Sequence, residues 1–122
     1  MQEHALQRRA EIKRAYKEAP VQAGVYAIKN LKNGKLLVAS HGALQGRFNR
    51  HRFELSTHCH ECQALQADWD SLGQEAFAFE VLEELKPPEP ANAFWDQKAA
   101  LLALEKLWLN KLQPYGEKGY NE

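Results

Sequence analysis

The dipeptide Asn33-Gly34 constrains the fold of this chain most strongly, because it stands between two short apolar segments. Asn-Gly in that position predicts a β-hairpin, since a two-residue type I′ turn needs a positive φ at both central residues. We therefore expect two antiparallel strands, over residues 23–31 and 35–40. Every later element has to pack on one of the two faces of this hairpin.

The length of the hairpin loop decides which residues of the two strands face each other. With a loop of two residues, Tyr26 lies opposite His41 and Ile28 lies opposite Ala39. Alternate residues of a strand share a face, so the hairpin residues divide into two sets. One set contains Tyr26, Ile28, Asn30, Leu37, Ala39 and His41, and the other contains Val25, Ala27, Lys29, Leu36, Val38 and Ser40.

The periodicity of apolar residues predicts the remaining elements. Alternation predicts a third strand over residues 76–82, and helical spacing predicts helices over residues 3–18, 43–54, 61–72 and 94–112. The fold class that follows is α+β, with a three-stranded antiparallel sheet flanked by helices and an extra N-terminal helix. We expect residues 1–20 to form that helix and residues 21–122 to form one domain, because 122 residues suit a single core.

Hydropathy argues against a membrane protein, since no apolar segment approaches the length of a membrane span. The first residues are polar and helical in pattern, which is not typical of a signal peptide. We therefore expect a cytoplasmic protein with no membrane partner. In that compartment the two cysteines are expected to be reduced.

The charges are unevenly distributed although the net charge is zero. Residues 19–53 carry no acidic residue, while residues 54–106 carry most of the acidic residues. A basic face suits a polyanion, but folding could also interleave the two halves and cancel the asymmetry. The basic residues of the first segment are Lys29, Lys32, Lys35, Arg47, Arg50 and Arg52.

Three residues combine chemistry with an informative position. Arg47 and His51 are four residues apart and share a helix face, where a guanidinium can bind a phosphate and an imidazole can exchange a proton. Glu105 interrupts an apolar helix face, where a carboxylate needs a compensating charge or metal. The alternatives are a surface arginine, a histidine whose hydrogen bonds are satisfied in the core, and a glutamate at the edge of the core.

Cys59 and Cys62 form a C-x-x-C motif with flanking histidines. A structural zinc site usually needs two such pairs, so His51, His58 or His60 would have to complete this one. A redox role would require the motif to follow a strand in a βαβ unit, which the pattern does not predict. Zinc and redox chemistry are both disfavoured, and two small residues near the start of a helix are the preferred interpretation.

Gly24-Val25-Tyr26 and, ten residues later, Leu37-Val38-Ala39 resemble the two-part signature of the GIY-YIG nuclease superfamily. The resemblance covers about residues 22–121 and is closest to the small stand-alone bacterial type. The ordered set that extends it consists of Ser40, Leu44, Arg47, His51, Glu105, Pro114 and Asn121.

The resemblance implies hydrolysis of DNA phosphodiester bonds by an endonuclease that uses Mg²⁺ or Mn²⁺. It implies that Glu105 binds the metal, that Arg47 binds the scissile phosphate, and that Tyr26 and His51 position or deprotonate water. Asn121 would support the site. DNA is the implied partner, with nucleic-acid contacts expected from Lys29, Lys35, Arg47, Arg50, Arg52 and Asn121.

The second half of the signature departs from the family pattern. Its second tyrosine is Leu37 and its glycine is Ala39 in this chain. Either Tyr26 serves as the only base, or His41, which the two-residue loop places opposite Tyr26, substitutes for the lost phenol. The alternative function is a catalytically weak or inactive module with the same fold that binds nucleic acid or a protein partner.

Overall fold

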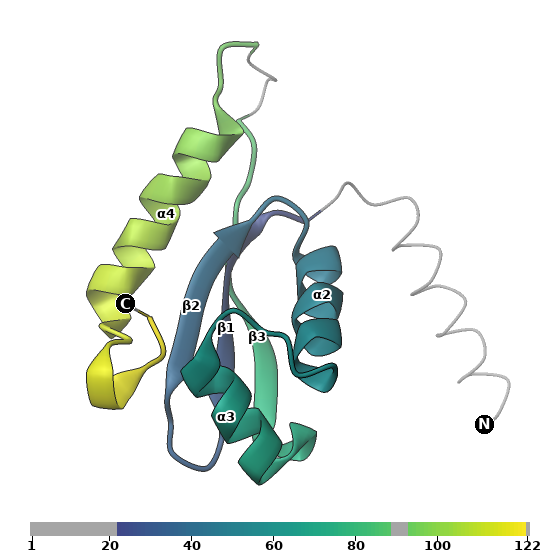
Figure 1. The fold of residues 1–122 in the computed structure, drawn as a ribbon. Helices are drawn as coiled ribbons and strands as arrows, with labels where there is room; N and C mark the ends of the chain where they lie inside the picture. The colour runs from purple at the N-terminus through teal and green to yellow at the C-terminus, as the bar shows by residue number, and fades with distance from the viewer. Residues whose placement is uncertain (1–21, 89–92, 122) are drawn as a thin grey trace, which may run out of the picture.

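A computed structural model describes residues 22–88 and 93–121 of the chain (Figure 1). The helix expected over residues 3–18 lies outside these residues. Within the described ranges no helix is long and apolar enough to cross a membrane. The described strands are β1 (Gly24–Asn30), β2 (Leu36–His41) and β3 (Phe77–Glu84), and the α-helices are α2 (Leu44–Ser56), α3 (Gln63–Leu72) and α4 (Gln97–Leu112).

The three strands form one antiparallel sheet in the order β2-β1-β3. Helices α2 and α3 cover one face and α4 covers the other, so β1 is buried on both sides (Figure 1). The α+β fold with a three-stranded antiparallel sheet is therefore confirmed for the described residues.

The hairpin loop is longer than the sequence predicted, and the predicted register is wrong. Tyr26 pairs with Ala39 and Gly24 pairs with His41, which shifts each partner by two residues. The cause is Asn30, whose side-chain oxygen accepts the Lys32 backbone N–H at 2.9 Å and whose carbonyl accepts the Gly34 N–H at 2.7 Å. A type I′ turn needs a positive φ at both Asn33 and Gly34, but only Gly34 of the two has one. The type I′ turn therefore does not form.

A shift of two residues leaves the two faces of the hairpin unchanged, because side chains alternate with a period of two. Tyr26 and Ile28 pack with α2 and α3 in one core. Val25, Ala27 and Val38 pack against the apolar residues of α4 in the other. The assignment of faces is confirmed although the pairing was wrong, and it places Tyr26 beneath α2.

Helix α4 begins three residues later than expected. The Asp96 carboxylate accepts the Ala99 N–H at 3.1 Å and caps the helix, which therefore starts at Gln97. Such a cap satisfies an N–H group that has no partner within the helix. Leu101 is buried, and Leu104 and Trp108 pack on the sheet, so Glu105 lies on the side of α4 next to β2.

The residues after α4 return along the outer edge of β2 (Figure 1). The Tyr120 N–H donates to the Leu36 carbonyl at 2.8 Å. The Asn121 side chain accepts the Val38 N–H at 2.8 Å and donates to the Val38 carbonyl at 2.7 Å. Its amide therefore makes the hydrogen bonds that a neighbouring strand would make at this edge of β2. The Tyr120 hydroxyl donates to Asp68 at 2.6 Å, which ties the same segment to α3.

Gly119→Ala is expected to lower the free energy of unfolding by about 1–3 kcal/mol, the usual cost of overpacking. A Cβ at Gly119 would overlap the Pro114 and Leu36 carbonyl groups, which are backbone and cannot rotate away. Urea denaturation measures the effect. Gly46→Ala is the control, because a Cβ there meets nothing within 4 Å and alanine favours the helix. Equal stability of Gly119→Ala and the wild type would contradict the proposed backbone clash.

Candidate active site

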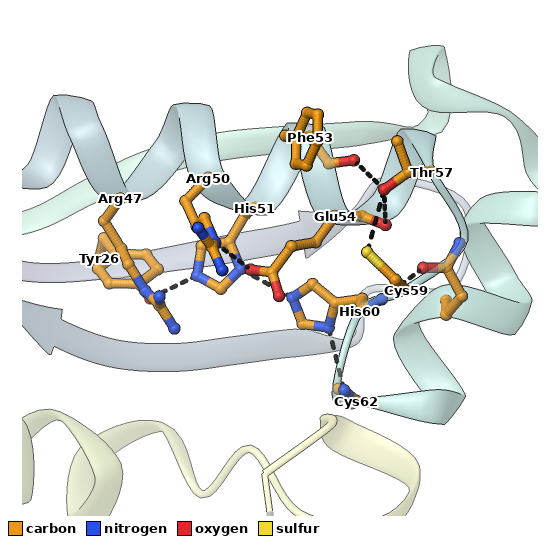
Figure 2. Close-up of polar contacts among 11 residues, drawn as sticks. Tyr26, Arg47, Arg50, His51, Phe53, Glu54, Thr57, Cys59, His60 and Cys62 are labelled. Carbon is orange, nitrogen blue, oxygen red and sulfur yellow. Dashed lines mark hydrogen bonds and ion pairs between the residues drawn. The ribbon is translucent and has the colours of Figure 1, made fainter.

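Tyr26 and His51 form a buried pair at the centre of the site (Figure 2). The Tyr26 hydroxyl lies 2.6 Å from His51 Nε2. β1 presents Tyr26 on its α2-facing side, and the helical spacing of Phe48, His51 and Leu55 directs the imidazole toward it. The Phe48 ring packs edge-on against Tyr26 with ring centroids 5.4 Å apart, which fixes the phenol from the side.

Arg47 joins this pair from one helical turn earlier in α2. Its Nε–H donates to the Tyr26 hydroxyl over 3.4 Å, which is at the long end for a hydrogen bond. The guanidinium also lines the cleft described below. Arg47 therefore connects the buried phenol with a space that a substrate phosphate can enter. The three residues predicted from the start of the chain, Tyr26, Arg47 and His51, do converge.

His60 continues the chain of contacts behind His51. His60 Nε2 lies 2.8 Å from His51 Nδ1, and the two rings stack with an interplanar angle of 26°. The backbone N–H of Cys62 donates to His60 Nδ1 at 3.0 Å. Figure 2 shows Tyr26, His51, His60 and Cys62 in a row. Because an amide N–H can only donate, this last bond determines the direction of the others.

The tautomers of both histidines follow from the Cys62 N–H. His60 Nδ1 accepts, so the proton of neutral His60 is on Nε2 and is donated to His51 Nδ1. His51 then carries its own proton on Nε2 and donates it to the Tyr26 oxygen. The Tyr26 oxygen accepts from His51 and from Arg47, and only its own O–H remains for another partner.

The protonation states agree with these tautomers. Burial, with Arg47 and the two neighbouring histidines His60 and His41, lowers the pKa of His51 to about 3. Burial is also the largest cause that lowers the pKa of His60, while the nearby Glu54 and Glu61 oppose it. Both imidazoles are therefore neutral at physiological pH, which the accepting nitrogen of each ring requires.

The Tyr26 phenol is harder to ionise than a free tyrosine. Burial raises its pKa above the ordinary value of 10.0, whereas the hydrogen bond and the charge of Arg47 lower it. The carboxylates of Glu105 and Glu61 raise the pKa further through space. The group is therefore a neutral phenol near pH 7, and a phosphate or metal in the site would change this balance.

Glu105 lies on α4, on the opposite face of the sheet from Tyr26, and it is not among the residues that line the cleft described below. Its Oε1 accepts the Ser40 backbone N–H at 2.9 Å and the Ser40 hydroxyl at 3.3 Å. Oε2 has no hydrogen-bond partner among the residues that the structure describes. Ser40 orients the carboxylate while its outer oxygen stays available, and no arginine of the described residues pairs with Glu105. The side chain is half-buried at the edge of the core, so the ordinary interpretation as a core-edge glutamate that reaches solvent also fits its position.

A cleft of about 410 Å³ opens beside Arg47. The residues that line it are His41, Ala43, Gly46, Arg47, Arg50, Glu54 and Glu61. Arg50 pairs with Glu54 at 3.5 Å on the rim. The cleft is therefore lined by the two arginines Arg47 and Arg50 and by the two carboxylates Glu54 and Glu61, which also act on His60.

His41 does not lie where the predicted register placed it. It pairs with Gly24 and is exposed on the cleft rim, two residues along β2 from the strand partner of Tyr26. Its Nδ1 accepts the Ala43 N–H at 2.9 Å. The neutral ring therefore has its proton on Nε2, so His41 offers a donor to the cleft and has no free nitrogen with which to replace the missing phenol.

The other predicted nucleic-acid contacts do not line this cleft. Lys29 lies on the sheet face covered by α4. The Arg52 guanidinium stacks on Phe79 at 4.4 Å and the Lys35 ammonium lies 5.7 Å from the Tyr120 ring centre. The oxygen and the nitrogen of the Asn121 side-chain amide are both bonded to the Val38 backbone. Of the predicted set, Arg47 and Arg50 are the residues that share the cleft.

The cysteine motif is part of the loop that holds His60. Cys59 is exposed, with its sulfur 3.0 Å from the Thr57 hydroxyl, and both cysteines are free thiols. Within residues 22–88 and 93–121, no group of three or more His, Cys, Asp or Glu side chains is arranged to hold a metal ion. Cys62 contributes its backbone N–H to the site.

A divalent metal at Glu105 has to be compatible with a single carboxylate. Mg²⁺ commonly keeps several waters and takes one or two protein carboxylates plus phosphate oxygens of the substrate. An oriented carboxylate with a free outer oxygen fits that pattern of coordination. It does not fit a closed structural site with four protein ligands.

Comparison with known proteins identifies the family. The model of the GIY-YIG catalytic domain matches residues 22–121. The "Intron-associated endonuclease 1" of Enterobacteria phage T4 is 31% identical over 101 residues, which are 83% of this chain. The chain spans 37% of the length of that protein.

Two solved structures have the same fold. A mutant of the catalytic domain of intron endonuclease I-TevI superposes with a TM-score of 0.67 and 28% identity, covering 83% of this chain and 93% of that one. The catalytic domain of homing endonuclease I-TevI gives a TM-score of 0.66 and 29% identity, covering 81% and 96%. Both solved domains that share this fold are catalytic domains of endonucleases. The chain belongs to the GIY-YIG family.

Sequence reasoning missed His60 and Gln66. His60 was considered only as a zinc ligand, yet it bonds His51 in the core. Gln66 is buried and accepts the His60 backbone N–H at 3.1 Å while it donates to the Leu55 carbonyl at 2.9 Å. One signal was available, because four of the five histidines lie between residues 41 and 60.

Proposed function

We propose that this chain is a divalent-metal-dependent endonuclease that hydrolyses DNA phosphodiester bonds. The observation that carries the proposal is the hydrogen-bonded cluster of Tyr26, His51 and Arg47 at a cleft, with the Ser40-oriented carboxylate of Glu105 acting on the same phenol. Family relatives are named endonucleases, and this supports the same reaction class for this chain.

Arg47 binds the scissile phosphate in this proposal. A guanidinium is permanently charged and donates to two phosphate oxygens at once, so it stabilises the charge that grows on the phosphorus oxygens in the transition state. Only the Nε–H of Arg47 is bonded to Tyr26, over 3.4 Å, so the two terminal amino groups of the guanidinium are the donors that bind the phosphate. Arg50 and the Nε2–H of His41 line the same cleft and bind the neighbouring phosphate.

Tyr26 takes the proton of the attacking water. The His51 Nε2–H and the Arg47 Nε–H are both directed at its oxygen, and these two donors stabilise the phenolate. The remaining lone pair of the phenolate is the one that can accept a proton from water. His51 is a donor in this arrangement and supports the phenolate without acting as the base.

Glu105 would hold Mg²⁺ or Mn²⁺, and the bound ion would supply charge stabilisation for the departing oxygen. The chain's own contribution is the orientation of the carboxylate by the Ser40 N–H and hydroxyl. Ser40 precedes His41 in β2, and neighbouring strand residues point to opposite faces, so Ser40 orients Glu105 on the α4 face while His41 lines the cleft on the other face.

The alternative function is a module of the same fold that binds nucleic acid or a protein partner without cleaving. Leu37 favours it, because this residue packs into the core and no second phenol stands beside Tyr26 on β2. The chain also departs from the family signature at Ala39. The retained Tyr26–His51–Arg47 cluster makes the endonuclease the better-supported proposal.

Purified full-length chain is expected to cleave DNA in Mg²⁺ or Mn²⁺ and to lose this activity in excess EDTA. Supercoiled plasmid, nicked, branched and single-stranded DNA form the substrate panel, and gel electrophoresis counts the breaks. Cleavage that persists in EDTA would exclude the metal-dependent mechanism. Salt-sensitive binding with no cleavage of any substrate would favour the alternative module, because phosphate contacts weaken as salt rises.

A further inference from the structure

His60 is a buried polar residue to which the proposed reaction assigns no role. It is 7% exposed, stacks on His51 and contacts no residue that lines the cleft by a hydrogen bond. A histidine inside a core needs hydrogen-bond partners for its ring nitrogens. In this chain every polar atom of the His60 ring is used, and each bond has only one allowed direction.

Two hydrogen bonds fix His60 in addition to its bond to His51. The backbone N–H of His60 donates to Gln66 Oε1 at 3.1 Å, and the ring Nδ1 accepts the Cys62 N–H at 3.0 Å. Gln66 in turn donates to the Leu55 carbonyl at the end of α2 and to Asp70, each at 2.9 Å. The loop that carries His60 is thereby attached to both α2 and α3, and the imidazole cannot turn over without breaking the Cys62 bond.

We propose that His60 is a positioning residue for Tyr26: anchored by the Cys62 N–H, it holds His51 in the Nε2–H tautomer, so that His51 donates to the Tyr26 oxygen and cannot remove its proton. The role in catalysis rests on the proposed endonuclease function. The tautomer itself is a property of the folded chain and is testable without any substrate.

The chain of donors ends at a group that cannot lose a proton, and this decides what the chain can do. If His51 gave its proton to Tyr26, His60 would have to pass its own Nε2 proton to His51. His60 would then be an imidazolate, because the Cys62 amide cannot supply a replacement proton. The row Cys62–His60–His51–Tyr26 therefore orients and polarises the phenol oxygen and does not relay protons.

Nitrogen-15 NMR of the imidazoles tests the tautomer directly. In the wild type the His51 Nε2 is expected to show the shift of a protonated ring nitrogen and Nδ1 that of an unprotonated one, throughout pH 5–8. His60→Leu removes the donor and is expected to release His51 into a mixture of tautomers. His60→Gln keeps an N–H near the same position and is expected to retain the wild-type tautomer.

Cleavage assays then test the consequence for the site. His60→Leu is expected to lower kcat by about 10- to 100-fold, as losses of supporting hydrogen bonds typically do, while the Kd for DNA stays unchanged. His60→Gln is expected to recover most of kcat. His58→Gln is the matched control, because His58 is an exposed histidine of the same loop, paired with Asp70 at 2.8 Å.

Protonated Nδ1 on wild-type His51, or an unchanged His51 tautomer in a folded His60→Leu protein, would overturn the proposal. Thermal unfolding of each variant identifies a protein that has failed to fold, and in that case the His60→Gln spectrum decides. A wild type with the expected tautomer but no cleavage activity supports the hydrogen-bond assignment and overturns only the endonuclease function.

Discussion

Glu105→Gln is expected to lower the rate of metal-dependent cleavage about a thousandfold or more, since the charge stabilisation supplied by a bound metal is worth several kcal/mol and each 1.36 kcal/mol is tenfold. Glutamine keeps an oxygen that can accept the Ser40 N–H, so the fold and the orientation of the side chain are preserved. The substitution removes the negative charge of the carboxylate and replaces its outer oxygen with an amide NH2 group, which cannot bind a metal ion. Initial rates of plasmid nicking at saturating Mg²⁺ measure the effect.

Glu83→Gln is the matched control for this prediction. Glu83 is a carboxylate that also accepts a neutral N–H donor, Trp108 Nε1 at 2.9 Å, and it is not among the residues that line the cleft. It is expected to cleave at the wild-type rate. A Glu105→Gln protein that nicks DNA within tenfold of the wild type would remove Glu105 from the proposed metal site.

The sequence predicted the elements of the sheet well, because alternation and helical spacing are local signals. The predicted hairpin register was wrong because a side-chain hydrogen bond within the turn lengthens the loop. Asn30 binds the Lys32 N–H and lengthens the turn, which an Asn-Gly dipeptide does not reveal. The predicted assignment of residues to the two faces of the hairpin was still correct, because the register is shifted by an even number of residues.

The site was predictable to the extent that its residues share one short element. The spacing of four residues predicts that Arg47 and His51 share a helix face. They contact Tyr26 because β1 directs its side chain toward α2. His60 depends on a loop between α2 and α3 and on Gln66, and no periodicity places either of them. The basic segment was misleading because neighbouring lysines and arginines of a strand and helix face different sides, as Lys29 and Arg52 do.

Tyr26→Phe is expected to lower kcat by about 100- to 10,000-fold, the usual contribution of a general base. The phenyl ring keeps its packing on Phe48, but the N–H groups of His51 and Arg47 lose their acceptor. Leaving the buried His51 donor unsatisfied is expected to cost about 1–3 kcal/mol of stability. Tyr120→Phe is the matched control, because this buried tyrosine also loses bonds, to Asp68 and Asn30, yet lies outside the cleft.

The pH dependence of the wild type separates a base from a passive hydrogen-bond donor at Tyr26. Because the pKa of Tyr26 is raised above 10.0, the phenolate fraction, and with it kcat, is expected to increase about tenfold per pH unit from pH 6 to pH 9. The titration of His51 is not expected to change the slope of the pH–rate profile in this range, since His51 has a pKa of about 3. Hydroxide could produce the same slope, so the Tyr26→Phe protein must be measured in parallel. A flat wild-type profile, or an unchanged slope at an unchanged rate in Tyr26→Phe, would mean that the phenol only positions substrate.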